Sequence, residues 1–336
     1  MMKPVPLTRC AFVAPFAGIL NRMGAPGASL LSKFRLPTNI EEKPEQYVAL
    51  FPALRFVAAA QLSQGIIDFG FLAGRQLAFR HLSPQFQATV RRSPTLLAAL
   101  ESWRRFIQLE DSVLRIRLER HAQSLRVCFV NTFPGAERMP HLEHAQWIQN
   151  IMTIHVVREF AGPGWMPATF AFQSRYSPGI ETQSFWPHTR FLSGQYATWI
   201  DVPASLLGLP NPASRRAREP LGGRLQPFDT DIVSTLKLML ASYLDECVPS
   251  IMEAAEIAGT SVRTLQRELA TAGLTYSSLL DQVQFERAAE MLRETDAKII
   301  EVAHATGFEN PSHFSRAFRR IAGVTPREFR QSSAAR

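Results

Sequence analysis

The chain has 336 residues, of which 46% are hydrophobic, and this length suits two domains that each bury a core. Its cysteines (Cys10, Cys128 and Cys247) lie too far apart for a metal-binding or redox motif, which argues against a disulfide framework and indicates a reducing compartment. The formal net charge is +8, but residues 231–336 hold 12 basic and 14 acidic residues, so the positive excess lies in residues 1–230. The overall charge alone therefore does not identify a nucleic-acid-binding protein.

The first apolar stretch, residues 10–20, follows Lys3 and Arg9 as in the start of a secretory signal peptide. A signal would need small residues at its cleavage site, whereas this chain continues with NRMG at 21–24. The apolar residues also recur at helical spacing, at Leu7, Phe12, Phe16, Ile19, Leu20 and Met23. We therefore predict an amphipathic helix that ends near Gly24, and no uninterrupted apolar stretch is long enough to span a bilayer.

Residues 10–110 are predicted to be mostly helical, with helices at 12–23, 27–34, 44–62, 69–77 and 94–109. Ser93 is the expected N-cap of the last helix, and Pro94 its first residue. From residue 112, SVLRIRLERH alternates polar and apolar side chains, which predicts a half-buried strand. LRVCFVNT from residue 125 predicts a second strand. A helix at 143–160 and extended segments from 166 and 195 complete an α+β or α/β unit that ends near residue 209.

Residues 210–227 (PNPASRRAREPLGGRLQP) are rich in Pro, Gly, Ser and Arg, a composition typical of a linker. A helical stripe then resumes with Ile232, Leu236, Leu240 and Leu244. We accordingly predict an N-terminal effector-sensing or dimerisation domain (1–209), a linker (210–228) and a C-terminal helical domain (229–336).

The C-terminal region contains an internal near-duplication. IMEAAEIAGTSVRTLQRELATAGLTY from residue 251 parallels IIEVAHATGFENPSHFSRAFRRIAGVTP from residue 299. Each copy reads as an Ala-rich helix, a turn at Gly259 or Gly307, and a second helix that ends at Gly273 or Gly323. This order is typical of a helix-turn-helix motif. One helix, at 276–294, is predicted to join the two copies.

The second helix of each copy is amphipathic. In the first copy Ser261 is the expected N-cap, and the apolar face holds Val262, Leu265 and Leu269. Its opposite face holds Arg263, Gln266, Arg267 and Ala270. In the second copy Asn310 is the expected N-cap before Pro311, and the inward residues are Phe314, Phe318 and Ile321. A capping box at Thr325 and Glu328 is expected to begin one more helix.

The exposed residue types suit the major groove of DNA. Arg can form paired hydrogen bonds to guanine and Gln to adenine, while Ser, Thr and helix N-termini can hold phosphates. The predicted DNA-binding residues are Arg263, Thr264, Gln266, Arg267, Ser312, His313, Ser315, Arg316, Arg319 and Arg320. For either helix alone, a solvated polar face is an equal alternative, and the duplication favours DNA contact.

Two segments, SVRTLQRELATAGLTYSSLLDQVQFERAAEML and IIEVAHATGFENPSHFSRAFRRIAGVTPREFR, resemble the AraC/XylS family of bacterial transcription regulators. More diffusely, FAGILNRMGAPGASLL, SPTLLAALESWRRFIQLED and YATWIDVPASLLGLP resemble the sensor domain of the subgroup that contains ornithine-utilisation regulators. The resemblance implies one recognition helix with Arg263, Gln266 and Arg267, and another with Ser312, His313, Ser315 and Arg316. Gln284 departs from the family pattern, which usually has arginine there, so one basic contact or inter-helix bond is not expected.

Motifs of common enzyme classes are absent from the sequence, which has no GxGxxG, Walker loop or HExxH. HLEH at 141–144 is the one local metal-like cluster, and we interpret it as surface polar residues. The scattered cysteines argue against a fused alkyl-transfer domain, and Cys128, in mid-strand, against an amidotransferase-like one. A set of N-terminal residues lines either a small-molecule pocket or the core and surface, so no effector site is assigned: Trp147, Trp165, Arg175, Tyr176, Trp186, Arg190 and Trp199.

The sequence therefore predicts an α+β N-terminal sensor domain followed by an all-α double helix-turn-helix DNA-binding domain. The predicted function is that of a cytoplasmic transcription regulator without catalytic activity, metal or cofactor. The expected partners are double-stranded DNA, a small-molecule effector and a second copy in a homodimer, and the family resemblance adds RNA polymerase and activation. Two alternatives stay open: an effector-independent regulator whose N-terminal domain only dimerises, and an enzyme domain fused to a DNA-binding tail.

Overall fold

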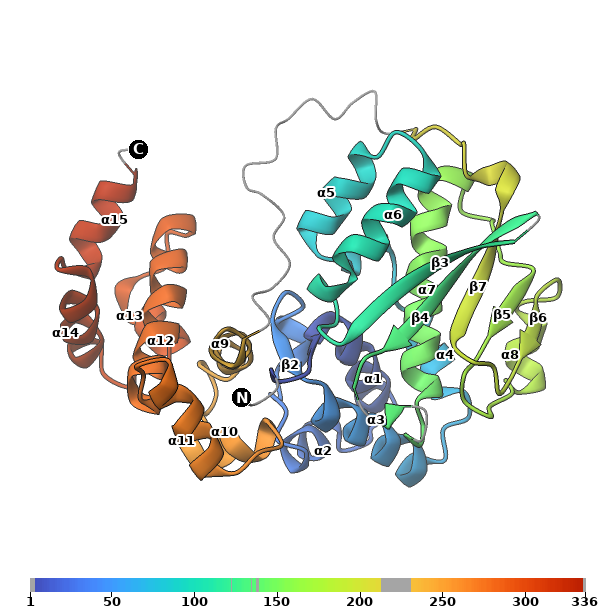
Figure 1. Ribbon diagram of the computed structural model, residues 1–336. Helices are drawn as coiled ribbons and strands as arrows, with labels where there is room; N and C mark the ends of the chain where they lie inside the picture. The colour runs from blue at the N-terminus through green and yellow to red at the C-terminus, as the bar shows by residue number, and fades with distance from the viewer. Residues whose placement is uncertain (1–3, 122, 134, 137–138, 213–230, 335–336) are drawn as a thin grey trace. The chain divides into compact units, whose positions relative to one another are not determined.

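The computed structural model describes residues 4–121, 123–133, 135–136, 139–212 and 231–334 (Figure 1). Contacts between Cα atoms divide the chain into two compact units. The N-terminal unit comprises residues 6–45 and 50–228, and the C-terminal unit comprises 229–336 together with the short segments 1–5 and 46–49. Most of the predicted linker, from residue 213 onward, lies outside the described residues.

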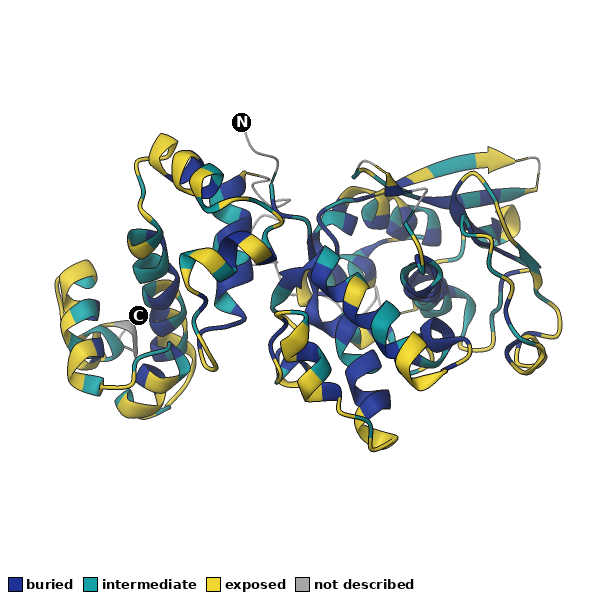
Figure 2. Ribbon diagram, turned by 90° about the horizontal axis from the view of Figure 1, so that it is seen from below, coloured by how far each residue is buried: buried dark blue, intermediate teal, exposed yellow. Residues whose placement is uncertain are grey.

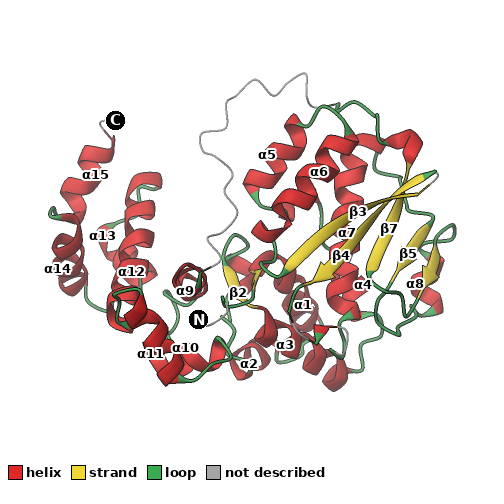
Figure 3. Cartoon of the chain, in the orientation of Figure 1, coloured by secondary structure: helices red, strands yellow, loops and turns green. Residues whose placement is uncertain are grey.

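The N-terminal unit is built around a mixed sheet of five strands in the order β3-β4-β7-β5-β6 (Figure 3). Its strands are β3 (Leu114–His121), β4 (Ser124–Asn131), β5 (Thr169–Ala171), β6 (Arg190–Leu192) and β7 (Thr198–Pro203). Neighbouring strands are antiparallel except β5 and β6. The register places Ile116 opposite Phe129 and Val127 opposite Ile200, so apolar side chains continue across the sheet.

The longest helix of this unit, α7 (Glu143–Ala161), packs against the sheet. Asn150 anchors α7 to the sheet, because its Nδ2 donates to the backbone oxygen of Ala171 (3.3 Å) and to Oγ1 of Thr198 (3.0 Å). Besides short 3-10 helices, the unit contains β1 (Leu7–Arg9), α1 (Cys10–Arg22), α2 (Gly27–Lys33), α3 (Leu50–Gln64), α4 (Phe69–Gly74), α5 (Pro84–Arg92), α6 (Leu96–Phe106) and α8 (Ile180–Ser184).

An aromatic cluster fills the space between α7 and the sheet. Trp147 is fully buried, and its ring centroid lies 4.6 Å from that of Phe170 and 5.1 Å from that of Phe172. Trp186 and Phe71 pack against the same indole. Trp147, which the sequence left open as pocket or core, thus belongs to the core, whereas Trp186 belongs to this core and also lines an open groove of the unit. Figure 2, coloured by burial, shows long buried stretches in dark blue on the helices.

Where the structure describes the C-terminal unit, it is helical apart from the short strand β2 (Tyr47–Ala49). Its helices are α9 (Ile232–Ala241), α10 (Ile251–Ile257), α11 (Val262–Thr271), α12 (Tyr276–Glu294), α13 (Ile299–Ala305), α14 (Pro311–Ala322) and α15 (Pro326–Ala334). Side-chain caps begin several of them: Asp231 accepts from two backbone amides of α9, and Ser250 forms a capping box with Glu253. No helix among the described residues combines the length and apolar character needed to cross a bilayer.

The structure confirms the fold class and both helix-turn-helix motifs, but several predicted boundaries are wrong. The helix expected from residue 94 begins at Leu96, with Oγ1 of Thr95 accepting the capping bond from Ala98 N. Ser93 instead closes α5, a helix that was not predicted, and its hydroxyl donates to the backbone oxygen of Thr89. The helix expected at 44–62 begins only at Leu50, because 47–49 form β2. Leu7, expected on a helical stripe, lies in β1.

The turn glycines of the two motifs provide a matched pair for testing the fold. Both have the left-handed backbone that disfavours side chains, with φ of 67° at Gly259 and 81° at Gly307. An added Cβ at Gly307 would lie 2.8 Å from the backbone oxygen of Leu244 and 2.9 Å from Cγ2 of Val248, whereas at Gly259 it would meet nothing within 4 Å.

We expect Gly259→Ala to lower the free energy of unfolding by about 1–2 kcal/mol, because it adds backbone strain only. Gly307→Ala adds a steric clash and should cost roughly 3 kcal/mol or more. Chemical denaturation of the two variants, compared with wild type, measures both values. Equal losses would show that the turn at Gly307 is looser than the structure has it.

Candidate DNA-binding surface and ligand cavity

Helix α11 presents a polar face and buries an apolar one. Oγ of Ser261 accepts a hydrogen bond from Thr264 N (3.1 Å), which confirms the predicted N-cap. Leu265 and Leu269 are buried, as predicted. On the other face Arg263, Gln266 and Arg267 are exposed, while Thr264 is half-buried and shares a hydrogen bond with Ser261.

The arginines of α11 differ in their partners. Arg267 Nη2 lies 3.3 Å from Oε1 of Glu268, whose side chain is only 8% exposed, so Arg267 neutralises a buried carboxylate. Arg263 has no ion-pair partner within the described part of the chain. Of the two, Arg263 is therefore the freer to bind an external group.

Helix α14 shows the same division. Oδ1 of Asn310 caps it by accepting from Ser312 N (2.8 Å), and Pro311 takes the first helical position. Phe314 and Phe318 are buried, and their ring centroids lie 5.8 Å apart. The polar face holds the exposed Ser312, His313, Arg316, Arg319 and Arg320 and the half-buried Ser315.

Two expectations for α14 need refinement. Ile321 was expected to point inward but is 42% exposed, because Phe314 and Phe318 already fill the core between α14 and α12. Arg320 Nη2 forms an ion pair with Oδ2 of Asp281 on α12 (2.5 Å), so this arginine also fastens α14 to α12. Across the described residues, Arg316 has no ion-pair partner.

Helix α12 holds the two motifs in one unit. Leu279 and Val283 are buried in its first half, and Ala288, Ala289 and Leu292 in its second half, where they join the core around Phe318. Figure 1 shows α11 at the start of α12, and α13 and α14 further along it. The ten predicted DNA-binding residues are thus brought together as two separate sets, one on α11 and one on α14.

Gln284, where the family usually has arginine, is only 9% exposed. Its Nε2 lies 3.4 Å from the position that a Cβ would take at Gly307, so it packs beneath the turn of the second motif. This buried amide therefore adds no charge to the polar faces of α11 and α14.

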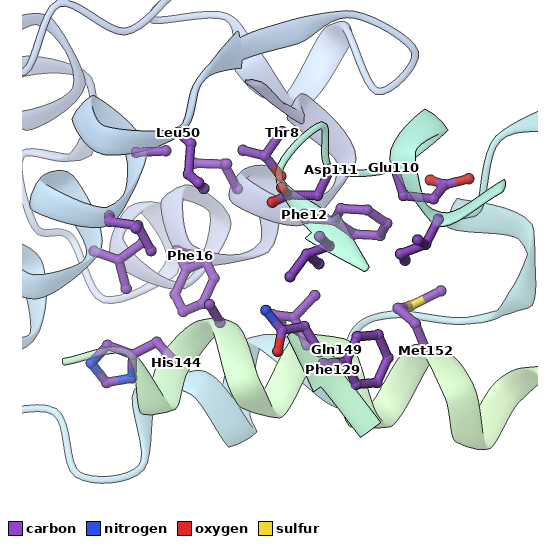
Figure 4. Close-up of a pocket in the computed structure, with 18 of the residues that line it drawn as sticks. Thr8, Phe12, Phe16, Leu50, Glu110, Asp111, Phe129, His144, Gln149 and Met152 are labelled. Atoms are coloured by element: carbon purple, nitrogen blue, oxygen red, sulfur yellow. The ribbon is translucent and has the colours of Figure 1, made fainter. Parts of the chain in front are cut away.

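The N-terminal unit contains a cavity with mainly apolar walls (Figure 4). Its volume is about 70 Å³, several times the space that one water molecule requires. Aromatic side chains from three separate elements, α1, α6 and β4, contribute to the walls: Phe12, Phe16, Trp103 and Phe129. Aliphatic residues complete them, including Val13, Leu50, Ala53, Val57, Ile107, Ile148 and Met152.

Two of the polar residues around the cavity already have hydrogen-bond partners within the protein. Glu110 accepts from Arg9 Nη1 (2.9 Å) and from the backbone amide and hydroxyl of Ser83 (2.9 and 2.6 Å), and both Arg9 and Glu110 are buried. His144 Nδ1 accepts from Gly70 N (3.2 Å), and its Nε2 lies 2.9 Å from Oε1 of Gln61. Burial lowers the pKa of His144 to about 4, so its ring is neutral near pH 7.

Asp111 is the unusual polar residue of this cavity. Its Oδ1 accepts from Val113 N (3.2 Å), and the side chain of Thr8 also bonds it. It is only 8% exposed and has no cationic partner in the part of the chain that the structure describes. Burial raises the pKa of this carboxyl to about 7. Asp111 was not among the residues predicted from the sequence, because its only local signal is an acidic pair, Glu110–Asp111, just before a buried strand.

A second, more open groove of about 210 Å³ lies elsewhere in the N-terminal unit. Arg75 and Arg158 line it together with His155 and aromatic side chains. The guanidinium of Arg75 lies 4.3 Å from the ring centroid of Phe185, and Nε of Arg158 donates to the backbone oxygen of Trp165 (2.9 Å). No acidic residue is among the described residues that line this groove, so its character is cationic.

The HLEH segment brings His141, Glu143 and His144 together, with potential ligand atoms within 4.8 Å of one another. Both ring nitrogens of His144 already have hydrogen-bond partners, and His141 Nδ1 lies 3.5 Å from Oε1 of Glu143. A metal ion would have to displace those bonds, so the geometry favours a structural role for His144.

Two of the three cysteines are chemically shielded. Cys10 and Cys128 are buried, which raises the pKa of their thiols to about 12 and about 11. Cys247, between α9 and α10, is exposed.

Comparison with known proteins agrees with this architecture. Residues 24–211 match the family described as the arabinose-binding domain of AraC transcription regulators, N-terminal, and residues 254–332 match a helix-turn-helix domain family. The chain is 23% identical to the HTH-type transcriptional regulator VirS of Mycobacterium tuberculosis over 338 residues, which cover 96% of both proteins. It is 32% identical to the ornithine utilization regulator of Pseudomonas aeruginosa over 142 residues, 40% of this chain and 41% of that protein.

Among solved structures, the transcriptional regulator CdpR from Pseudomonas aeruginosa aligns over 94% of this chain and 96% of its own, with 16% identity and a TM-score of 0.41. The matched families and relatives are transcription regulators, so the alternative of a fused enzyme domain is wrong. The chain belongs to the AraC family of transcription regulators, and its C-terminal helix-turn-helix unit binds double-stranded DNA.

Proposed function

We propose that this regulator binds a small-molecule effector in the cavity of its N-terminal unit and in response activates transcription. The observation that carries the proposal is the cavity itself: a space of about 70 Å³, mostly apolar, with a buried carboxylate at its wall. Well-packed protein interiors rarely keep a space of this size, and small-molecule sites combine apolar walls with a few polar groups.

The activating role is supported by the likeness to a known activator. This chain is 38% identical over 78 residues to the HTH-type transcriptional activator RhaS of an Enterobacter species, a match that covers 23% of this chain and 28% of that protein. By this likeness the chain would act in the cytoplasm, with RNA polymerase as its partner on DNA. A homodimer formed through the N-terminal unit is part of the same proposal.

Cavity-filling substitution tests effector binding. Ala53 is a small, buried residue of the cavity wall, and Ala53→Leu would occupy part of the space while leaving the unit apolar. In a reporter strain that carries the promoter beside the gene, we expect the inducing compound to activate the wild type and not the variant. Thermal unfolding of both proteins with the compound provides the direct measure, since a ligand of the folded state raises apparent stability.

If the variant folds, binds DNA and responds as the wild type does, the effector does not bind in this cavity. If no compound changes the reporter output or the thermal stability of the wild type, the regulator is independent of effectors, and its N-terminal domain only dimerises.

We also propose that α11 and α14 read two different blocks of one DNA site. Their exposed sets differ in chemistry, with Arg263 and Gln266 on α11 against His313 and Arg316 on α14. Helix α12, which carries both motifs, has 19 residues and is therefore about 28 Å long, close to one turn of DNA at about 34 Å. Successive major grooves on one side of the duplex are the natural match for this spacing.

Arg316→Ala should weaken binding to the specific site by about 1–3 kcal/mol, because an arginine without an internal partner is free to contact a guanine or a phosphate. Its stability should stay near that of the wild type. Arg327→Ala is the charge-matched control, since Arg327 is exposed on α15, outside both second helices. Titrations by fluorescence anisotropy at two salt concentrations compare them, and equal losses in the two variants would mean that α14 contributes only general charge.

Inserting about five base pairs between the two blocks should abolish specific binding, because half a turn moves one block to the far side of the duplex. An insertion of about ten base pairs should also weaken binding, since α12 fixes the reach of the two helices. Footprinting on the unaltered site and on the two lengthened sites measures both effects. Binding that is indifferent to the half-turn insertion would mean that one motif reads bases alone.

A further inference from the structure

We propose that the cavity of the N-terminal unit selects a small organic ammonium ion, whose charged nitrogen pairs with the Asp111 carboxylate and whose apolar body lies against the aromatic walls. This inference rests on the proposed function, because it names the chemical class of the effector. It would make the regulator a sensor of amines.

The charge of the cavity walls gives the first argument. The described residues that line the cavity include no lysine and no arginine, but two carboxyl groups, Glu110 and Asp111. Arg9 and Ser83 already satisfy Glu110. Among the described residues, the carboxyl group of Asp111 receives hydrogen bonds only from neutral donors, the backbone of Val113 and the side chain of Thr8. A cation inside the cavity would thus find one unpaired carboxylate.

The cost of burying that carboxylate gives the second argument. Aspartate is almost never buried without a partner, because an ionised carboxylate loses its hydration in an apolar environment. Without a cationic partner, Asp111 avoids this cost by staying largely protonated below its pKa of about 7. A ligand that carries a positive charge and its own N–H donors supplies the missing partner and favours the ionised form.

The aromatic walls give the third argument. Ammonium groups are attracted to the faces of aromatic rings, and the cavity is lined by Phe12, Phe16, Trp103 and Phe129. In the view of Figure 4, Asp111 lies above the space and Gln149 below it. The buried Oε1 of Gln149 has no hydrogen-bond partner among the described residues, so this amide has capacity left for a second polar group of the ligand.

The titration of Asp111 can be distinguished from that of the other charged groups near it. Glu110 is held in the ion pair with Arg9, and His144 is neutral above about pH 5 because its pKa lies near 4. The Arg115 guanidinium is turned toward the backbone oxygens of Ser112 and Leu114. Among the described residues that line the cavity, Asp111 is therefore the group whose charge changes around pH 7.

Three probes of equal length and different charge test the proposal on the full chain: n-hexylamine, 1-hexanol and hexanoate. Calorimetric titration at pH 7.5 should show hexylamine binding at least roughly tenfold more tightly than hexanol, since a hydrogen-bonded charge pair is much stronger than a neutral one. Hexanoate should not bind in the cavity. Ala53→Leu should weaken hexylamine and hexanol alike, because it removes space rather than charge.

Asp111→Asn keeps the shape of the side chain and removes its charge, so the preference for hexylamine over hexanol should fall to about twofold or less. In the wild type, the affinity for hexylamine should rise up to about tenfold per pH unit below pH 7 and level off above it, with release of a proton on binding. The Asn variant should lack both effects.

The same variant reports on its own folding. Because the pKa of Asp111 is raised in the folded state, the wild type should lose stability relative to Asp111→Asn as pH rises from about 4 to about 7. If the Asn variant fails to fold, the pH dependence of hexylamine binding to the wild type still decides the question.

Each contrary outcome identifies what failed. Equal affinity for hexylamine and hexanol, with both blocked by Ala53→Leu, would overturn the ammonium inference and leave the cavity as the effector site. Hexanoate binding that is insensitive to Asp111→Asn and Ala53→Leu would point to the groove of Arg75 and Arg158 and place the sensed charge there instead. Absence of hexylamine binding would overturn the inference outright.

Discussion

The DNA-binding unit depends on one constraint: a single helix, α12, must serve two hydrophobic cores at once. Leu279 and Val283 belong to the buried side of its first half, and Ala288 and Leu292 to that of its second half. Since each helical residue advances 1.5 Å and turns about 100°, the length of α12 sets both the separation and the relative rotation of α11 and α14. Removing one residue from its middle would rotate one motif by about 100° while leaving every local capping signal intact.

Local capping and turn signals explain why the helices of this unit could be predicted from the sequence. Ser261 and Asn310 cap their helices through bonds that span two or three residues, and Gly259 and Gly307 adopt left-handed turns. Such signals need no knowledge of the distant chain. These local signals gave a wrong helix start at Ser93, because a serine can precede the first residue of one helix or follow the last residue of another. In the structure Ser93 follows the last residue of α5.

The cavity could not be predicted in the same way, because its walls come from distant parts of the chain. Thr8, Asp111 and Gln149 are far apart in sequence, and only the folded unit brings them around one space. The ion-pair partner of an arginine likewise depends on the folded structure. Sequence ranks Arg267 and Arg316 as equivalent reading residues, yet one is paired with a buried glutamate and the other has no ion-pair partner among the described residues. Packing decides which arginine forms an ion pair within the protein, and the sequence pattern does not show packing.

The three cysteines differ in exposure, so this protein can be labelled for spectroscopy at one site. A thiol-reactive dye attacks the thiolate, and burial keeps Cys10 and Cys128 both covered and protonated near neutral pH. Cys247 is exposed between α9 and α10, within the unit that binds DNA. The unaltered chain should therefore accept a single fluorophore at one defined place, so that its arrival on a promoter can be followed in real time without engineering any residue.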